Sequence, residues 1–307
     1  MYSKIKPILM SHLVSKFIVF FLLFPSVICS QNTLEYNLNV NDSLTISQSS
    51  TQDIIQDMDG SKHEMSNILL GDFTFIVKTV TDSSYVINFK FNRFKLVSNS
   101  NIYGELINID TNNDIKEDDL ESKIFSGLTK SVLKMEMLKN GKIKTVSGTD
   151  AMISKMISDA GVLDEFTKEI MIEAMKKEFG NESLARSFEQ MTYFYPSKKV
   201  AIGDHWSNIY SGDLNAENNW TLDGLSDAIE LSAKSNITMI AEEDTHIMTL
   251  SGTQNTNITA NKETGFAELI NVVSSTEGIT AMKQMNDVEI PTTIKSITTY
   301  KIKKHVQ

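Results

Sequence analysis

Apolar and polar residues alternate with a period of two along most of this chain, and this pattern constrains the fold more than any other feature. Apolar side chains stand at every second position in 73–77 and again in 87–91, on either side of the polar turn 82–84. Because successive side chains of a strand point to opposite faces, these segments predict an antiparallel hairpin with one buried face. The apolar series resumes one step late at Phe94, which predicts a β-bulge at 92–93.

A second hairpin and a run of further strands follow the same pattern. Residues 133–139 and 142–146 flank Asn140-Gly141, a pair favoured in two-residue hairpin turns. Alternation returns after Val200, where threonine, isoleucine and valine supply β-forming side chains. The strands predicted there span 218–223, 227–233, 236–241, 245–251, 265–274, 278–284 and 294–302.

The segment 149–193 changes to helical spacing. Apolar residues recur there every three or four positions, Gly161 and Gly180 stand where helices end, and Asn181 stands where a third helix would be capped. We therefore predict an α+β fold: antiparallel β-meanders or an open curved β-barrel, with an inserted three-helix segment. Its predicted parts are an N-terminal β-rich region 31–148, a helical segment 149–195 and a C-terminal β-rich region 196–307, with 31–307 as a single domain the alternative.

Residues 1–30 have the composition of a cleavable export signal. Lysines precede the apolar run 17–24, which is too short to span a membrane as a helix, and the segment contains no acidic residue. The small Ser30 before Gln31 predicts cleavage between these two residues. Cys29 offers an alternative, a lipid anchor, although the residue before it is a poor match to that signal. We expect an exported protein, periplasmic or extracellular.

Composition excludes several classes of function. Cys29 is the only cysteine, so cleavage after it would exclude disulfide frameworks, cysteine-ligated zinc and cysteine nucleophiles. The formal net charge is −10 and no lysine or arginine cluster occurs, which disfavours nucleic acid as a partner, since its phosphates must be neutralised. No later apolar stretch has the length of a membrane helix, so membrane contact is expected only during export.

The acidic stretch 110–121 places oxygen-bearing side chains at the spacing of a calcium-binding loop. However, Ile115 occupies the position of the glycine that such a loop needs, and Glu117 that of an apolar residue. We therefore predict a solvated loop and a helix from Lys116 to about Leu128. The histidines form no His-x-His or His-x-x-x-His pair, and no nucleophile turn or phosphate-binding loop occurs. No metal, cofactor or enzymatic activity is expected.

Two short segments, 38–44 and 200–206, share the pattern apolar-x-apolar-x-Asp-x-apolar. Each stands at the start of a β-rich stretch, where Asp42 and Asp204 would cap a turn by accepting backbone N–H groups. Neighbouring strand residues point to opposite faces, so His205 is predicted to be exposed and the following tryptophan buried. The repeat favours duplication of a meander unit.

The same motifs resemble an uncharacterised family of secreted proteins of Bacteroidota, a domain of unknown function. The resemblance rests on the export signal and on LNVND (38–42), NGKI (140–143), VSGTD (146–150) and VAIGDHW (200–206). It spans most of the chain after the signal, and Asn41 departs from the Gly-Asp pair that is usual in the first segment. The resemblance implies a cell-envelope or secreted setting and no particular activity.

The favoured function is non-enzymatic binding of a lipid or another apolar ligand. A curved antiparallel sheet with a methionine-rich helical cover resembles, by architecture only, bacterial carriers of lipids or lipoproteins. The ligand is expected between the sheet and the helices of 149–193, where flexible methionines adapt their shape. The alternative is a structural or interaction module that meets an envelope protein and has no small-molecule pocket. The candidate lining residues are Met152, Met156, Phe166, Ile170, Met171, Met175 and Phe188.

Overall fold

The computed structural model describes residues 31–305 apart from 213, 243 and 284–287, so the expected signal 1–30 lies outside the described residues. The strands are β1 (Ser43–Met58), β2 (Ser61–Val80), β3 (Ser84–Ser100), β4 (Gly104–Asp110), β5 (Leu133–Leu138), β6 (Ile143–Ser147), β7 (His205–Tyr210), β8 (Leu214–Gly224), β9 (Ile229–Glu242), β10 (His246–Ala260), β11 (Ala267–Met282) and β12 (Val288–His305). The helices are α2 (Leu120–Ser126), α3 (Thr149–Asp159), α4 (Glu165–Phe179) and α5 (Asn181–Thr192), with the 3₁₀ turn η1 (Gly127–Lys130).

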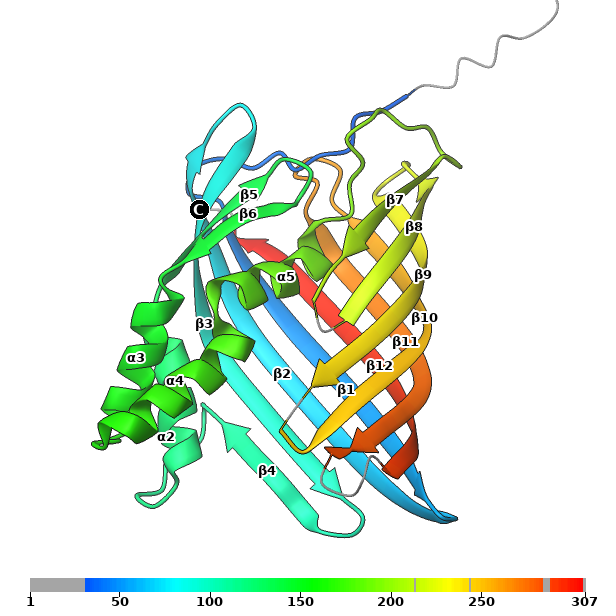
Figure 1. Cartoon of the computed structure of the whole chain (residues 1–307). Coiled ribbons are helices and arrows are strands. Elements are labelled where there is room, and N and C mark those ends of the chain that lie inside the picture. Colours follow the sequence, from blue (N-terminus) through cyan, green and yellow to red (C-terminus); the bar gives the residue numbers. More distant parts are fainter. Residues whose placement is uncertain (1–30, 213, 243, 284–287, 306–307) are drawn as a thin grey trace, which may run out of the picture.

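The strands form one 12-stranded sheet that curves around a concave face (Figure 1). Their order is β6-β5-β3-β2-β1-β12-β11-β10-β9-β8-β7, and β4 pairs with the remaining half of β3. Two antiparallel meanders are therefore joined where β1 pairs with β12. Among the described residues β6 and β7 do not pair with each other, so the sheet is open. The predicted antiparallel α+β architecture with a helical insert is confirmed, as an open curved sheet.

The hairpin of β2 and β3 carries the predicted bulge. Phe73 pairs with Phe91, whereas the residue before Phe73 pairs with Arg93, so Asn92 is the extra residue of β3. The bulge returns Phe94 to the concave face, where it lines the same cavity as Phe73. The apolar series therefore continues along one face of the strand.

The C-terminal strands are longer than predicted. The predicted strands 227–233 and 236–241 lie largely on the single strand β9, and 265–274 and 278–284 lie largely on β11. One predicted break coincides with Ser235, which is buried on the concave face. An inward polar residue interrupts the apolar pattern without interrupting the strand, because the backbone ladder does not depend on side-chain polarity.

The hairpin predicted at Asn140-Gly141 is present, but its loop has three residues. The N–H of Leu138 donates to the carbonyl of Lys142 (2.8 Å), and the N–H of Gly141 donates to the carbonyl of Leu138 (2.9 Å). Gly141 has a φ of +92°, a left-handed conformation that glycine adopts without steric penalty. A Cβ at this position would meet the carbonyl of Thr192 in α5, so the hairpin packs directly against that helix.

Three helices, α3 to α5, interrupt the two meanders as predicted (Figure 1). The N-cap of α5 is Gly180, and Asn181 is the first residue of the helix. The side chain of Asn181 accepts a hydrogen bond from the hydroxyl of Thr149 (2.8 Å). The helix predicted after the acidic stretch is α2, and it begins later than expected. The side chain of Asp119 caps it by accepting a hydrogen bond from the N–H of Ser122 (2.9 Å).

Aromatic side chains fill the space between α5 and the sheet. Phe188 of α5 meets the rings of Phe73, Phe75 and Phe89 edge-to-face, at centroid separations of 6.2, 5.5 and 4.8 Å. All four side chains are buried. Such ring pairs contribute about 0.5–1.5 kcal/mol each beyond their area burial. The aromatic core therefore lies at one end of the concave face, beneath the helices.

The two Asp-containing repeats form the same turn before β1 and β7. Asp42 accepts a hydrogen bond from the N–H of Asn39 (2.9 Å), and Asp204 accepts one from the N–H of Ala201 (2.8 Å). The residue before each aspartate is left-handed, with φ values of 71° and 89°. Asparagine tolerates this conformation better than most residues, which explains why Asn41 can stand where glycine is usual. The predicted caps are confirmed.

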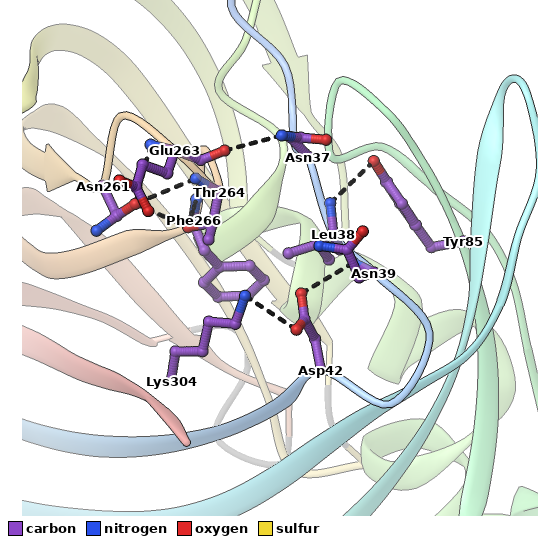
Figure 2. A network of polar contacts seen from close by, with 10 residues as sticks. All are labelled: Asn37, Leu38, Asn39, Asp42, Tyr85, Asn261, Glu263, Thr264, Phe266 and Lys304. Carbon is purple, nitrogen blue, oxygen red and sulfur yellow. Dashed lines mark hydrogen bonds and ion pairs between the residues drawn. The ribbon is translucent and has the colours of Figure 1, made fainter. Parts of the chain in front are cut away.

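The segment before β1 ties the two meanders together (Figure 2). The side chain of Asn37 donates to the carbonyl of Glu263 (3.0 Å) between β10 and β11, and the next N–H along the chain donates to the hydroxyl of Tyr85 (3.3 Å) on β3. Asp42 forms an ion pair with Lys304 of β12 (2.9 Å). These contacts fix the curvature at the end of the sheet where the helices lie.

Candidate ligand-binding site

An apolar cavity lies between the helices and strands β1, β2 and β3. Its volume is about 440 Å³, within the range of about 300–1,000 Å³ that is typical of small-molecule sites. Strands β2 and β3 form one wall, and α5 with the end of α4 forms the other. Its apolar lining residues are Leu69, Phe73, Phe91, Phe94, Leu96, Phe125, Phe179, Leu184, Phe188 and Met191.

Three phenylalanines from different elements gather at the edge of this cavity. Phe94 of β3 stacks on Phe125 of α2 at a centroid separation of 5.2 Å, and Phe179 of α4 lies edge-to-face to them at 6.1 and 5.9 Å. All three are only partly buried and pack against the rim of the core. These rings therefore form the partly exposed part of the cavity lining, and the buried Phe73, Phe91 and Phe188 form its inner part.

Polar groups from both walls also line the cavity. Gln48, Glu178, Ser187 and Gln190 line it, together with Tyr300 of β12. Burial raises the pKa of Tyr300 to about 12, so its hydroxyl remains protonated at neutral pH. The site thus combines an apolar wall with a few polar groups, the arrangement that orients a ligand within an apolar pocket.

The helical residues predicted to line the site occupy several environments. Phe188 is 4% exposed and lines the cavity. Met152 and Met156 are buried in the core, and they lie outside the set of lining residues. Met171 and Met175 of α4 are partly buried against the core and also lie outside that set. Most of the methionines therefore act as core filler.

The predicted inward orientation of Phe166 and Ile170 is wrong. These side chains are 71% and 54% exposed, and none of the residues of α4 is fully buried. The helix carries two apolar stripes, and the one with Met171 and Met175 is turned towards the core. Helical periodicity shows that both stripes exist, but it does not show which of them meets the sheet.

Sequence reasoning missed most of the cavity wall. Phe94 was predicted on the apolar face of a strand, because the apolar series resumes at this residue after the bulge. Phe125 and Phe179 come from helices separated by two other helical elements. Only the tertiary packing brings these last two rings within 5.9 Å of each other.

The acidic stretch considered for calcium is engaged in other contacts. The carboxylate of Asp110 accepts hydrogen bonds from Arg93 (2.6 and 3.1 Å) and lies 3.6 Å from the ammonium of Lys95. The hydrogen bond from Arg93 lowers the pKa of Asp110. Within the described ranges of the chain, no group of three or more histidine, cysteine, aspartate or glutamate side chains could hold a metal ion.

The Asp204-His205-Trp206 segment has the structural roles predicted for it. His205 is exposed and hydrogen-bonds to Thr221 (2.9 Å), while Asp204 caps its turn. Trp206 is buried, and its indole N–H donates to the carbonyl of Phe194 (2.9 Å). The carboxylate therefore serves the backbone rather than the imidazole.

The geometry defines an open, curved antiparallel sheet with a helical insert over an apolar cavity. Residues 82–267 match the model of DUF6263, a family of unknown function, and the chain belongs to this family. No curated protein matches the chain. Within the part of the chain that the structure describes, no helix has both the length and the apolarity needed to cross a membrane.

One solved structure resembles the fold of this chain without resembling its sequence. A lipovitellin structure that concerns lipid–protein interactions is 6% identical, with a TM-score of 0.50 over 87% of this chain and 25% of that one. The chain thus spans about a quarter of the length of that lipovitellin chain. An outer membrane channel from Pseudomonas putida F1 is 8% identical, with a TM-score of 0.25 over 87% and 97% of the two chains. Only the lipovitellin similarity bears on the fold.

Proposed function

We propose that this protein is an exported, non-enzymatic carrier that binds a lipid or another apolar ligand between α5 and strands β1 to β3. The observation that carries the proposal is the cavity of about 440 Å³ with its wall of phenylalanines and leucines. Removing apolar ligand surface from water contributes about 25 cal/mol per Å², so such a wall favours an apolar chain. The partly buried Phe94, Phe125 and Phe179 provide the entrance.

Two further observations support this proposal. Lipovitellin shares the fold, and its structure concerns lipid–protein interactions in that protein, which supports a lipid as the class of ligand. The apolar run 17–24 and the small Ser30 before Gln31 support export, with a lipid anchor on Cys29 as the alternative. The motifs shared with secreted proteins of Bacteroidota support a periplasmic or extracellular setting in that group.

Catalysis is not part of the proposal. The described residues that line the cavity include no histidine, lysine or cysteine, three of the side chains that serve as general bases or nucleophiles.

Titration with a fluorescent fatty-acid probe tests the proposal. We expect the parent protein to bind the probe, and Phe94→Ala and Phe179→Ala to weaken binding about tenfold each, the loss that corresponds to about 1.4 kcal/mol. Phe166→Ala is the matched control, because it removes the same side chain from the solvent-facing side of α4. The control should bind the probe as the parent does.

Two results would contradict the carrier. One is a parent protein that binds no probe and retains no lipid in native mass spectrometry after purification from its own cell envelope. The other is equal weakening by Phe94→Ala and Phe166→Ala, which would place the probe on the surface. Urea unfolding midpoints of the three variants show whether any loss of binding reflects a loss of folding.

The exposed apolar stripe of α4 favours the second candidate, an interaction module of the cell envelope. Phe166 and Ile170 on the first turns of this helix are 71% and 54% exposed, and Leu163 just before it is 86% exposed. Apolar side chains gathered on a surface mark interaction sites in soluble proteins. A parent protein without probe binding, but with an envelope partner that Phe166→Ala releases, would support this candidate in place of the carrier.

A further inference from the structure

A row of uncharged polar side chains crosses the concave face beside the apolar cavity. Each member stands directly opposite the next in the strand register, from β1 across β12, β11, β10 and β9 to β8. The row, called the polar belt here, consists of Gln52, Ser296, Ser274, Gln254, Ser235 and Asn218. It therefore spans both meanders and the pairing between β1 and β12.

Members of the polar belt face inward, where unpaired polar groups are costly. Ser235 and Asn218 are buried, and the hydroxyl of Ser235 donates to the side-chain oxygen of Asn218 (2.6 Å). The hydroxyls of Ser274 and Ser296 lie 2.7 Å apart. These contacts show a polar row that is built into the interior of the curve rather than exposed on its outer face.

A pocket of about 210 Å³ opens over the polar belt. Gln52, Gln254, Ser274 and Ser296 line it, and so does Thr276 in the next inward row of β11. Thr276 is 3% exposed, and its hydroxyl has no hydrogen-bond partner among the described residues. A buried hydroxyl without a partner loses its hydration on folding and gains no hydrogen bond in return. A ligand that forms a hydrogen bond with it therefore gains binding free energy at no further cost of dehydrating the hydroxyl.

The belt pocket and the apolar cavity adjoin each other. Gln190 of α5 and Tyr300 of β12 line both. None of the described residues that line the belt pocket carries a charge. A charged head group there would be desolvated without a counter-ion, whereas hydroxyl groups can both donate to glutamine oxygens and accept from serine and threonine.

We infer that the belt pocket binds an uncharged, hydroxyl-rich head group, a sugar or polyol, whose apolar tail occupies the adjoining phenylalanine-lined cavity. This inference rests on the proposed carrier function and names the class of its ligand. The hydroxyl of Thr276 supplies one hydrogen bond to the head group, and the amides of Gln52 and Gln254 supply others. The ligand class is a neutral glycolipid or a related polyol lipid.

Calorimetric titration with octyl glucoside, nonanoate and octyltrimethylammonium, each below its micelle concentration, tests the inference because the three share one octyl tail. We expect octyl glucoside to bind about tenfold more tightly than the two charged compounds, the discrimination expected from a neutral hydrogen-bonding site. Thr276→Val, which keeps the side-chain shape, should weaken octyl glucoside about fivefold and leave nonanoate unchanged. Thr253→Val, on the exposed outer face of β10, is the matched control.

Each result bears on one of the two proposals. Equal affinities for the three compounds, with Thr276→Val indistinguishable from Thr253→Val, would overturn the head-group assignment and leave the carrier intact. No binding of any of them would contradict the carrier itself. Titration with glucose alone distinguishes a glycolipid from a free sugar. If glucose binds as tightly as octyl glucoside, the inference of one amphipathic ligand that fills both pockets is wrong. Thr276→Val removes an unpartnered buried hydroxyl, so it should fold at least as stably as the parent.

Discussion

The two ends of the concave face are built on the same strands and differ in what those strands turn inward. On β3, Phe89 and Phe91 face inward at the covered end, the end beneath the helices. Ser98, which the strand register places in line with Gln52 of the belt, and Ser100 do so at the polar end. Figure 1 shows the described helices over the covered end. On β3, the helices therefore cover the part of the inward face that is apolar, whereas inward serines can be hydrated and need no such cover.

Removal of a ring from the covered end should have the largest effect on stability. Phe188 meets three buried phenylalanines, so Phe188→Ala should lower the free energy of unfolding by about 3–5 kcal/mol, as expected for a buried aromatic ring. Urea denaturation followed by circular dichroism measures the change. Phe166→Ala should change it by less than about 0.5 kcal/mol, because that ring is exposed. Similar losses of unfolding free energy for the two variants would show that the buried ring of Phe188 and the exposed ring of Phe166 contribute equally to stability.

Charge holds the end of β4 to β3 at the bulge, beside the apolar cavity. Arg93 holds the pKa of Asp110 below its usual range, so the pairing stabilises the fold above the ordinary aspartate pKa and is lost as the pH falls through the lowered value. Asp110→Asn should therefore cost about 1–2 kcal/mol at pH 7. That cost should shrink below about pH 4, where the unfolded chain takes up protons.

Urea midpoints of the parent and of Asp110→Asn between pH 3 and pH 7 measure this convergence. A constant difference across that range would show that the carboxylate acts through packing rather than through charge. Lys95→Met is a useful companion, since its ammonium lies 3.6 Å from the same carboxylate and should contribute less than Arg93.

The smallest effect on stability is expected when a pair of buried threonines at the polar end is replaced by valines. The hydroxyls of Thr280 and Thr292 lie 2.8 Å apart and are both buried. Replacing both in Thr280→Val/Thr292→Val removes donor and acceptor together, which should change the free energy of unfolding by less than about 1 kcal/mol in either direction. The single variants should each cost more than the double variant. A loss comparable to that of Phe188→Ala would show that the polar end is as tightly specified as the covered end.

Much of the fold could be predicted because its local signals agree with its tertiary structure. The period of two, the displaced register at Asn92 and the aspartate caps at Asp42 and Asp204 are local features, and each appears as predicted. The breaks predicted inside β9 and β11 were wrong because Ser235 of the polar belt and Thr276 in the next row are hydrophilic residues that face inward. Strand prediction from alternating polarity expects apolar residues on the inward face, so an inward polar residue is taken as the end of the strand.

The candidate site could be predicted only in outline. The position between sheet and helices followed from the order of the elements, but the cavity wall depends on contacts between α2, α4 and β3 that no periodicity records. Which of the two apolar stripes of α4 faces the core is likewise decided by tertiary packing. The belt becomes visible only once the strand register is known, since its members are spread from Gln52 to Ser296.

The pairing of β1 with β12 has a consequence for how quickly the chain can fold. Thr45 and His305 hydrogen-bond across this seam at 2.7 Å and are 260 residues apart in sequence. Closing so long a loop carries a high entropic cost before any contact repays it, and sheets dominated by non-local pairs fold in milliseconds to seconds rather than microseconds. Until the last strand arrives, one long edge of β1 stays open to other chains.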